Sequence, residues 1–530
     1  MDKSEYIDYK DTGCFSPLVT DYLAGNEKTK QFYTHPFSLP GIKAVISTRK
    51  GFETNRQLLV SQLKDQYKKL STTEKVKENI NSLADENTFT ICTAHQPNIF
   101  TGHLYFIYKI IHAIKLADHL KEQLPGNNFV PVFYMGSEDA DLDELGHIFL
   151  NGDKLDWKTK QTGAVGRMKV DEAFLKLIDI IEGEAAGEIY GKQLIDLIRR
   201  SYSKGSLIQD ATFKLTNELF GEYGLIVLLP DNPELKRQMT AIFKNDLYTH
   251  TPYETVTATT QKLSEHYKSQ AHPREINLFY LKDDIRNRII KKKEIFYVEG
   301  TDIKFTKEDI TEELKRHPER FSPNVILRGL YQEMILPNIA FIGGGGEIAY
   351  WLQMKDIFEH YNIPYPVLIL RNSFEIIDHS MKELMDKLDI STNDIFKTEQ
   401  ELINELVRKR SKLPLSLEEE RKQVEDAYNK IIVSTAKVDK SLAQHAEALK
   451  TKALKQIDKL EKKMLKAEKK KFDAEQRQVQ KLKNRLFPQG QLQERVENFI
   501  PYYALYGKDF FKMLYDNSLA LEQQFCLLMD

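Results

Sequence analysis

The sequence has few cysteines, no excess of either charge and no long apolar run. Its three cysteines, Cys14, Cys92 and Cys526, share no short spacing, which argues against a disulfide scaffold or a cysteine zinc site and favours a reducing compartment. Lys and Arg number 76 and Asp and Glu number 78, so no overall positive field favours nucleic acid as a partner. No run of about 18 apolar residues occurs, and the N-terminus has no apolar signal segment. We therefore expect a cytoplasmic protein without a membrane partner.

The first 375 residues alternate short apolar segments with longer amphipathic ones. This alternation is typical of an α/β domain with a largely parallel sheet. Helices are expected between the strands, for example over 103–120 and 347–361. Ligands of such sheets bind beyond the carboxyl ends of the strands, so the polar residues that follow each strand are the candidates for function. The predicted strands are "TFTICTA" (88–94), "FVPVFYMG" (129–136), "GLIVLLPD" (224–231), "AFIGGGG" (340–346) and "YPVLILR" (365–371).

Composition changes divide the chain into five parts. We expect a first part of the sheet domain over 1–154, an insertion or connecting region with one core strand over 155–325, and a second part of the sheet domain over 326–377. A coiled coil is predicted over 378–490, followed by a C-terminal helical segment over 491–530 that docks on the body.

The coiled-coil prediction depends on apolar residues at steps of three and four. "SKLPLSLEEE" (411–420) indicates a break and a new helix start, so two helices could form an antiparallel hairpin or pair across a dimer. The Lys-rich exterior has interleaved acids, which favours a solvated helix face over a nucleic-acid patch. The predicted seam is Leu442, Ala446, Leu449, Ala453, Ile457, Leu460, Met464 and Ala467.

The stretch "TAHQPNIFTGHLYFIYK" (93–109) follows the first strand and opens a long helix. Backbone N–H groups near Gly102 at the start of this helix could bind a phosphate or carboxylate. The tetrad "FTGH" (100–103) is one residue from the His-x-Gly-His signature of nucleotidyl-transfer enzymes, a weak match. His95 is better placed to face a ligand, although a structural role for it remains open. Lys109 could reach back to the helix start or lie in solvent.

A cluster of acids, "MGSEDADLDEL" (135–145), follows the second strand. Its carboxylates suit recognition of an ammonium group, a Mg²⁺ shell at phosphates, or general-base catalysis. The alternative is a capped helix start, for which a Ser followed by acids is also suitable. We favour function, because so many like charges beside a buried strand are costly unless a cation offsets them.

Four consecutive glycines, Gly343 to Gly346, lie between a strand and a helix. They allow close approach of the backbone to a ligand, although the spacing fits neither a Walker loop nor a dinucleotide fingerprint. Arg328 and Arg371 lie near strand ends and are candidate forks for carboxylate or phosphate, with surface pairing as the alternative.

Taken together, several runs resemble the bacillithiol biosynthesis cysteine-adding enzymes, a family of cysteine ligases. The resemblance spans nearly the whole chain, and its runs occur in the order of the family. They are "VTDYLAGNEKTKQFY", "TAHQPNIFTGHLYFIYK", "VPVFYMGSEDADLDE", "ILRGLYQEMILPNIAFIGGGGEIAYWLQMK", "PYPVLILRNSFEII" and "LFPQGQLQERVENFIPYY". Ala94 and His103 stand where the family pattern has Gly and Pro, so His103 is given no family role.

The resemblance implies a Rossmann-like, nucleotidyltransferase-type core and a coiled coil that mediates homodimerisation. It also implies that the chain joins the carboxyl group of L-cysteine to the amine of glucosaminyl-malate, the last step of bacillithiol synthesis. ATP is the expected activator, with Mg²⁺ as a further candidate, and no residues are assigned to a metal. The residues expected to be catalytic are His95, Asp139 and Asp141, and those expected to bind substrate or nucleotide are Gln96, Thr101, Gly102, Tyr105, Ser137, Glu138, Arg328, Gln332, Gly343, Gly344, Gly346, Glu347, Tyr350 and Arg371.

Three other functions remain open at this point. A coiled-coil assembly protein could bind a nucleotide or sugar phosphate without turning it over. A ligase with the same core could use another amine or acid, because specificity depends on a few pocket contacts. Nucleic-acid binding through the Lys-rich coil would show a steep dependence on salt.

Overall fold

The computed structural model describes residues 3–529, which divide into two compact units. The first, here called the body, consists of Ser4–Glu375 and Leu492–Cys526. The second, here called the helical unit, consists of Ile376–Gln491 together with Lys3 and residues 527–529. Within the described residues, no helix is long and apolar enough to cross a membrane.

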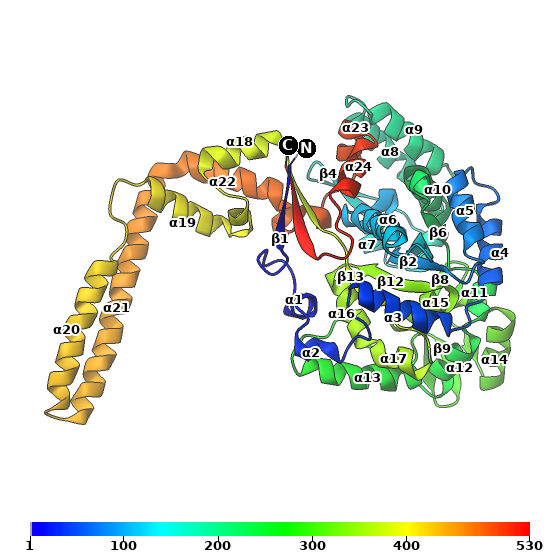
Figure 1. Ribbon diagram of the computed structural model, residues 1–530, viewed down its shortest axis with the longest axis horizontal. Coiled ribbons are helices and arrows are strands. Elements are labelled where there is room, and N and C mark those ends of the chain that lie inside the picture. Colours follow the sequence, from blue (N-terminus) through cyan, green and yellow to red (C-terminus); the bar gives the residue numbers. More distant parts are fainter. Residues whose placement is uncertain (1–2, 530) are drawn as a thin grey trace. The chain divides into compact units, whose positions relative to one another are not determined.

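The body is built around a five-stranded sheet in which every neighbouring pair is parallel (Figure 1). The chain runs outward from β2 through β3 to β6, and then returns to the other side of β2 for β12 and β13. This order has its topological switch point between β2 and β12, which is where open parallel sheets bind their ligands. In order across the sheet, the strands are β13 (Val367–Leu370), β12 (Asn338–Gly343), β2 (Thr88–His95), β3 (Asn128–Met135) and β6 (Ile226–Leu228).

Burial on both faces explains why these strands read as continuous apolar runs. The residues of β3 after Asn128, and all of β12, β13 and β6, are buried. On one face, Phe89 and Ile91 pack in a cluster with α3 (Leu39–Lys50) and α6 (Tyr105–Gln123). The predicted α/β class and all five predicted strands are confirmed.

The glycine run differs in detail from the prediction. The strand ends at Gly343, and α16 (Gly345–Gln353) begins two residues later, so the last two glycines are helical. The predicted helix over 347–361 is divided at Met354 into α16 and α17 (Lys355–His360). The backbone N–H of Gly344 donates to the Glu347 carboxylate at 2.8 Å, which explains why the helix starts this early.

Residues 155–325, predicted as a connecting region, contribute β6 and the whole of a second, antiparallel sheet. Its order is β10 (Lys304–Phe305), β9 (Ile295–Val298), β8 (Ile285–Lys292), β7 (Leu278–Lys282) and β11 (Phe321–Pro323). A two-stranded sheet pairs β4 (His147–Leu150) with β5 (Asp153–Asp156). A three-stranded sheet has the order β1 (Lys3–Asp8), β15 (Gln524–Met529) and β14 (Phe374–Ile377).

Most of the remaining helices of the body surround the two larger sheets (Figure 1). They include the two helices of the C-terminal segment, α23 (Ile500–Tyr506) and α24 (Asp509–Asp516). The others are α1 (Pro17–Leu23), α2 (Glu27–Lys30), α4 (Arg56–Tyr67), α5 (Glu74–Ser82), α7 (Leu142–Leu145), α8 (Glu172–Ala185), α9 (Gly191–Ser201), α10 (Ile208–Phe220), α11 (Pro233–Arg237), α12 (Thr240–Tyr248), α13 (Thr251–Ser264), α14 (Lys307–Arg316) and α15 (Val325–Ile335).

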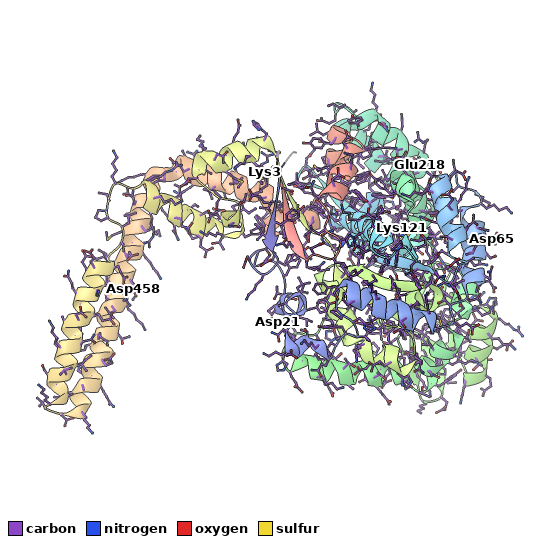
Figure 2. All side chains as sticks on the ribbon, viewed as in Figure 1. Lys3, Asp21, Asp65, Lys121, Glu218 and Asp458 are labelled. Atoms are coloured by element: carbon purple, nitrogen blue, oxygen red, sulfur yellow. The ribbon has the colours of Figure 1, made fainter. Side chains whose placement is uncertain are left out.

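The helical unit contains a long antiparallel hairpin of α20 (Glu418–Ala436) and α21 (Lys440–Lys469) (Figure 1). The other helices of the unit are α18 (His379–Leu388), α19 (Glu399–Arg410) and α22 (Asp473–Leu486). Figure 2 shows side chains projecting along the hairpin, where Asp458 of α21 lies 3.3 Å from Arg421 of α20.

The seam of α21 is only partly as predicted. Ala446 is buried, but Leu442, Leu449 and Leu460 are 44%, 42% and 52% exposed, and Leu454 and Leu465 are buried in their place. The predicted break before α20 is present, because α19 ends at Arg410 and α20 begins at Glu418. The hairpin therefore uses one face of α21 and leaves three leucines of the predicted seam on another.

Candidate functional site

A cavity of about 250 Å³ lies beyond the carboxyl ends of β2, β12 and β13, on both sides of the switch point. Strand ends supply His95 and Arg371, and the helix start after β12 supplies three glycines. Nine of the predicted site residues line this cavity. The full lining is His95, Gln96, Tyr105, Lys109, Glu144, Gln270, Arg328, Gly344, Gly345, Gly346, Glu347, Tyr350, Arg371 and Arg495.

His95 is the last residue of β2 and presents an unused nitrogen. Its Nε2 atom is buried and has no hydrogen-bond partner among the described residues. Burial, followed by the positive charge of Lys109, lowers the pKa of His95 well below 6.5. The imidazole is therefore neutral at neutral pH. His95 also lines the cavity, so the residue is placed to contact a ligand.

Lys109 and Glu347 form a buried ion pair at the start of α16. Lys109 also donates to the carbonyl oxygen of Ala94 at 2.9 Å, one residue before His95. The Glu347 carboxylate accepts the Gly344 N–H, and so occupies the place at the helix start where a ligand anion would bind. Burial lowers the pKa of Lys109, and the carboxylate of Glu347 opposes this effect.

Arg371 is held rigidly by the C-terminal segment. Its two terminal nitrogens each lie 2.6 Å from a carboxylate oxygen of Glu494, and both side chains are almost fully buried. Its own backbone N–H donates to the carbonyl oxygen of Gly343 at 2.8 Å, which joins β13 to the glycine run. The guanidinium lies 5.4 Å from the centre of the Tyr105 ring, so part of it faces the cavity.

Arg328 reaches the same cavity from α15 with far fewer contacts. It donates to the Tyr350 hydroxyl at 3.4 Å. Within residues 3–529, no carboxylate oxygen lies within 4 Å of its nitrogens. A Cβ atom added to Gly136 would lie 3.4 Å from Nη1 of Arg328, so the guanidinium packs directly on the end of β3.

The predicted anion site at Gly102 is not at the cavity. Gly102 has a φ of +68°, and a Cβ atom there would lie 2.8 Å from the Cβ atom of Asn98, so glycine is required. Thr101 is buried beside it. The backbone N–H of Leu104, at the helix start, donates to the carbonyl oxygen of Glu497 at 2.8 Å, so the C-terminal segment uses a donor that was expected to be free.

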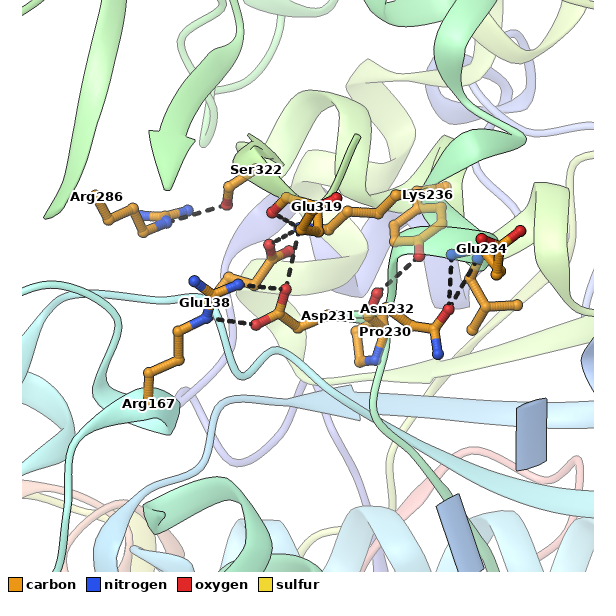
Figure 3. A network of polar contacts seen from close by, with 12 residues as sticks. Glu138, Arg167, Pro230, Asp231, Asn232, Glu234, Lys236, Arg286, Glu319 and Ser322 are labelled. Atoms are coloured by element: carbon orange, nitrogen blue, oxygen red, sulfur yellow. Dashed lines mark hydrogen bonds and ion pairs between the residues drawn. The ribbon is translucent and has the colours of Figure 1, made fainter. Parts of the chain in front are cut away.

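The acid cluster is divided among different roles. Ser137 and Glu138 are buried, and Glu138 pairs with the fully buried Lys236 (Figure 3). Lys236 also lies 3.3 Å from Asp231, which accepts two hydrogen bonds from Arg167 at 2.7 and 2.9 Å. The cation that the sequence requires for Glu138 thus comes from the protein itself.

Asp141 and Asp139 lie outside this network. Asp141 is exposed and accepts the Glu144 N–H at 3.0 Å, so it caps α7, which was the structural alternative for this stretch. Asp139 is half-buried and accepts a hydrogen bond from Gln96, a cavity residue, at 3.3 Å. Of the predicted catalytic acids, only Asp139 is therefore joined to the cavity.

Two further predicted residues also lie away from the cavity lining. Gln332 is buried and donates to Glu333 at 2.9 Å, in a network that joins Glu333 to Arg49 under the sheet. Gly343 ends β12, and a Cβ atom there would lie 2.8 Å from the Phe341 ring. Both positions serve the packing beneath the cavity.

The sequence prediction left Lys109 undecided between the helix start and solvent, included Gly345 only as part of the glycine run, and did not assign Glu144, Gln270 or Arg495 to the site. Lys109 had a usable signal, since it lies four residues after Tyr105 and therefore on the same helix face. Gln270 and Arg495 come from segments without a strand or motif pattern, so the sequence offered no local signal for them.

The cavity carries an excess of positive charge. Four of its lining side chains are cationic, Lys109, Arg328, Arg371 and Arg495, whereas Glu144 and Glu347 are its only acids. The start of α16 adds the partial positive charge of a helix N-terminus. The arrangement suits phosphate or carboxylate ligands. No group of three or more His, Cys, Asp or Glu side chains among residues 3–529 could hold a metal ion.

Comparisons with known proteins agree along the whole chain. The family model described as "Bacillithiol biosynthesis BshC, N-terminal Rossmann-like domain" matches residues 1–372, and "Bacillithiol biosynthesis BshC, C-terminal coiled-coil domain" matches residues 374–529. Relatives in Christiangramia forsetii and Flavobacterium johnsoniae, both named "Putative cysteine ligase BshC", are 39% and 38% identical, and the alignments cover 98% and 99% of both chains. One in Bacillus cytotoxicus with the same name is 27% identical, covering 93% of this chain and 94% of its own.

Proposed function

Because the chain belongs to the bacillithiol biosynthesis BshC family, we propose that it is a ligase that joins L-cysteine to the amine of glucosaminyl-malate, with ATP activating the cysteine carboxyl group. The observation that supports this most is the cationic cavity lined by His95 at the switch point of the sheet. Both the nucleotide and the acid to be activated are anions, and the cavity offers them an excess of positive charge.

The proposed reaction has two steps. A carboxylate oxygen of cysteine attacks a phosphorus atom of ATP, and pyrophosphate or ADP leaves with the electrons of the broken P–O bond. The amine of the acceptor then attacks the activated carbonyl carbon, a C–N bond forms, and AMP or phosphate leaves as the C–O bond breaks. The amine loses a proton in this second step, which requires a nearby base.

The start of α16 is the proposed phosphate position. Gly345, Gly346 and Lys109 line the cavity, and Lys109 pairs with Glu347 of the same helix start. The Glu347 carboxylate occupies this helix start and is negatively charged, as a phosphate would be, so a phosphate could take its place. Mg²⁺, when it accompanies ATP, is typically bound by the phosphates with one or two carboxylates, so no metal cluster of protein residues is required.

His95 and Asp139 are the proposed polar groups at the reacting atoms. The neutral ring of His95 contacts the substrate, and burial keeps the ring uncharged. Asp139 is held by Gln96 at 3.3 Å and receives the proton or the ammonium form of an amine. Asp141 caps α7 in this scheme.

A direct test combines the purified protein with L-cysteine, glucosaminyl-malate, ATP and Mg²⁺. Mass spectrometry follows the amide product, and chromatography follows the nucleotide. We expect a product with the combined mass of the two substrates less one water. AMP identifies an adenylate intermediate, and ADP an acyl phosphate. Absence of the amide while glucosaminyl-malate still binds would contradict the proposed ligation.

The partner proposed for the helical unit is a second copy of the chain. Leu442, Leu449 and Leu460 are spaced by seven and eleven residues on α21 and are exposed, which is the spacing of a coiled-coil face. Light scattering after size exclusion should give twice the monomer mass. The double variant Leu442→Glu, Leu449→Glu should give a monomer, whereas a dimer that persists in this variant would place the interface elsewhere.

A further inference from the structure

Arg286 is an arginine of the body whose guanidinium has almost no protein partner. It comes from β8, in the antiparallel sheet, and donates through Nε to the Ser322 hydroxyl at 3.1 Å (Figure 3). Its guanidinium carbon lies 4.1 Å from the centre of the Phe279 ring. Among the described residues, its two terminal nitrogens donate no hydrogen bond, and no carboxylate oxygen lies within 4 Å of them.

Two fully buried arginines of the body have carboxylate partners, whereas the partly buried Arg286 and Arg328 have none within 4 Å among the described residues. Arg49 pairs with Glu333 at 2.6 Å, and Arg371 pairs with Glu494 at 2.6 Å. The terminal nitrogens of Arg286 and Arg328 therefore keep N–H groups that an anion can bind, and a carboxylate or phosphate matches the geometry of such a guanidinium.

The two incomplete arginines belong to one electrostatic neighbourhood. Burial lowers the pKa of Arg286, the Asp139 and Glu138 carboxylates oppose this, and the charge of Arg328 adds to it. Glu138 is already paired with Lys236, whereas Asp139 has no ion pair among the described residues and accepts hydrogen bonds from the Gln96 side chain and the Asp141 backbone N–H. The neighbourhood adjoins the cavity, because Arg328 lines it and Asp139 is bonded to the lining residue Gln96.

We propose that Arg286 is a specificity residue that binds, together with Arg328, the dicarboxylate end of the amine substrate. The inference rests on the proposed function, since it concerns the acceptor of that reaction. A guanidinium presents two parallel N–H groups that match the two oxygens of a carboxylate, and two guanidiniums match two carboxylates. Binding at Arg328 places the sugar amine next to His95 and Asp139.

A phosphate could in principle use the same two arginines, so the test separates the two sources. Steady-state kinetics are measured for the wild type, Arg286→Gln and Arg286→Lys with glucosaminyl-malate, cysteine and ATP varied in turn. The matched control is Arg288→Gln, an exposed arginine two residues along the same strand. Methyl glucosaminide serves as an acceptor with the same amine and no carboxylate.

For Arg286→Gln we expect the KM for glucosaminyl-malate to rise on the order of 10- to 100-fold, as for the loss of a charged hydrogen bond. The KM values for ATP and cysteine should stay within about twofold of the wild type. The preference for glucosaminyl-malate over methyl glucosaminide should fall by the same factor as the acceptor KM rises. The acceptor KM of Arg286→Lys should lie between those of the wild type and Arg286→Gln, because lysine keeps the positive charge but lacks the two parallel N–H groups of a guanidinium.

Two outcomes would overturn the inference. A rise in the KM for ATP, with no rise in the KM for glucosaminyl-malate, would mean that the arginines bind the phosphates of ATP. An equal loss with both acceptors would mean that Arg286 is only structural. Calorimetric titration with malate alone needs no turnover, so tight binding to the wild type and weak binding to Arg286→Gln would support the site even if no amide forms. If Arg286→Gln fails to fold, the same titration is made with Arg286→Lys, for which weaker malate binding than in the wild type would support the site and unchanged binding would contradict it.

Discussion

The buried pair of Arg371 and Glu494 gives the sharpest prediction on stability. Glu494→Gln keeps the shape of the side chain and removes its charge, so Arg371 is left buried without a counter-charge. The two side chains are 3% and 0% exposed and form two bonds of 2.6 Å. Breaking such a pair by changing one partner costs about 3–5 kcal/mol. The exposed pair of Lys508 and Glu222, 54% and 63% exposed, offers a control.

Urea unfolding followed by tryptophan fluorescence measures this effect in the body alone. The chain has two tryptophans, Trp157 and Trp351, and both belong to the body. Glu494→Gln should lower the free energy of unfolding by about 3–5 kcal/mol, and Glu222→Gln by at most about 1 kcal/mol. Equal, small effects of the two variants would refute the reasoning that the C-terminal segment holds Arg371 in place.

Three further predictions follow from the same contacts. Burial lowers the pKa of His112 to about 4, and its Nδ1 atom accepts the Asn372 N–H. Because this pKa lies below the unfolded value of about 6.5, the neutral ring stabilises the fold above pH 6.5, and about 3 kcal/mol of that stability is lost as the pH falls toward 4. Urea titrations at several pH values should show a smaller loss in His112→Asn. Gly102→Ala should lower the free energy of unfolding of the body by about 1–3 kcal/mol, because residue 102 has a positive φ and an added Cβ atom would meet Asn98. Gly126→Ala is the control and should change the urea unfolding midpoint little, because an added Cβ atom there meets nothing within 4 Å. Asp139→Asn should lower kcat at least about tenfold. Asp141→Asn keeps a good helix cap and should retain the wild-type kcat. Similar losses of kcat in both variants would contradict the division of roles in the acid cluster.

The fold was predictable from sequence because its central strands are buried on both faces. Short apolar runs rich in β-branched and aromatic residues, such as "TFTICTA" and "VPVFYMG", are typical of strands in a sheet covered on both faces. The site was predictable to the extent that its residues follow those strands, as His95, Gln96 and Arg371 do. Local pattern and position along the chain sufficed for this part.

Pairings between distant segments could not be predicted from local pattern. Lys236, the cation for Glu138, lies 98 positions further along the chain, and Glu494, the partner of Arg371, lies 123 positions further. The donor at the start of α6 is used by Glu497, from the C-terminal segment. The face of α21 that packs against α20 likewise depends on the partner helix, which is why Leu442 and Leu460 are exposed.

The central claim is that amide formation takes place at the cavity beside β2. The most direct measurement is the rate of amide formation by His95→Gln, with tryptophan fluorescence confirming that the body remains folded. We expect a fall of at least about 100-fold with an unchanged urea midpoint. A folded His95→Gln protein that forms the cysteine amide at the wild-type rate would contradict the claim and place the chemistry elsewhere.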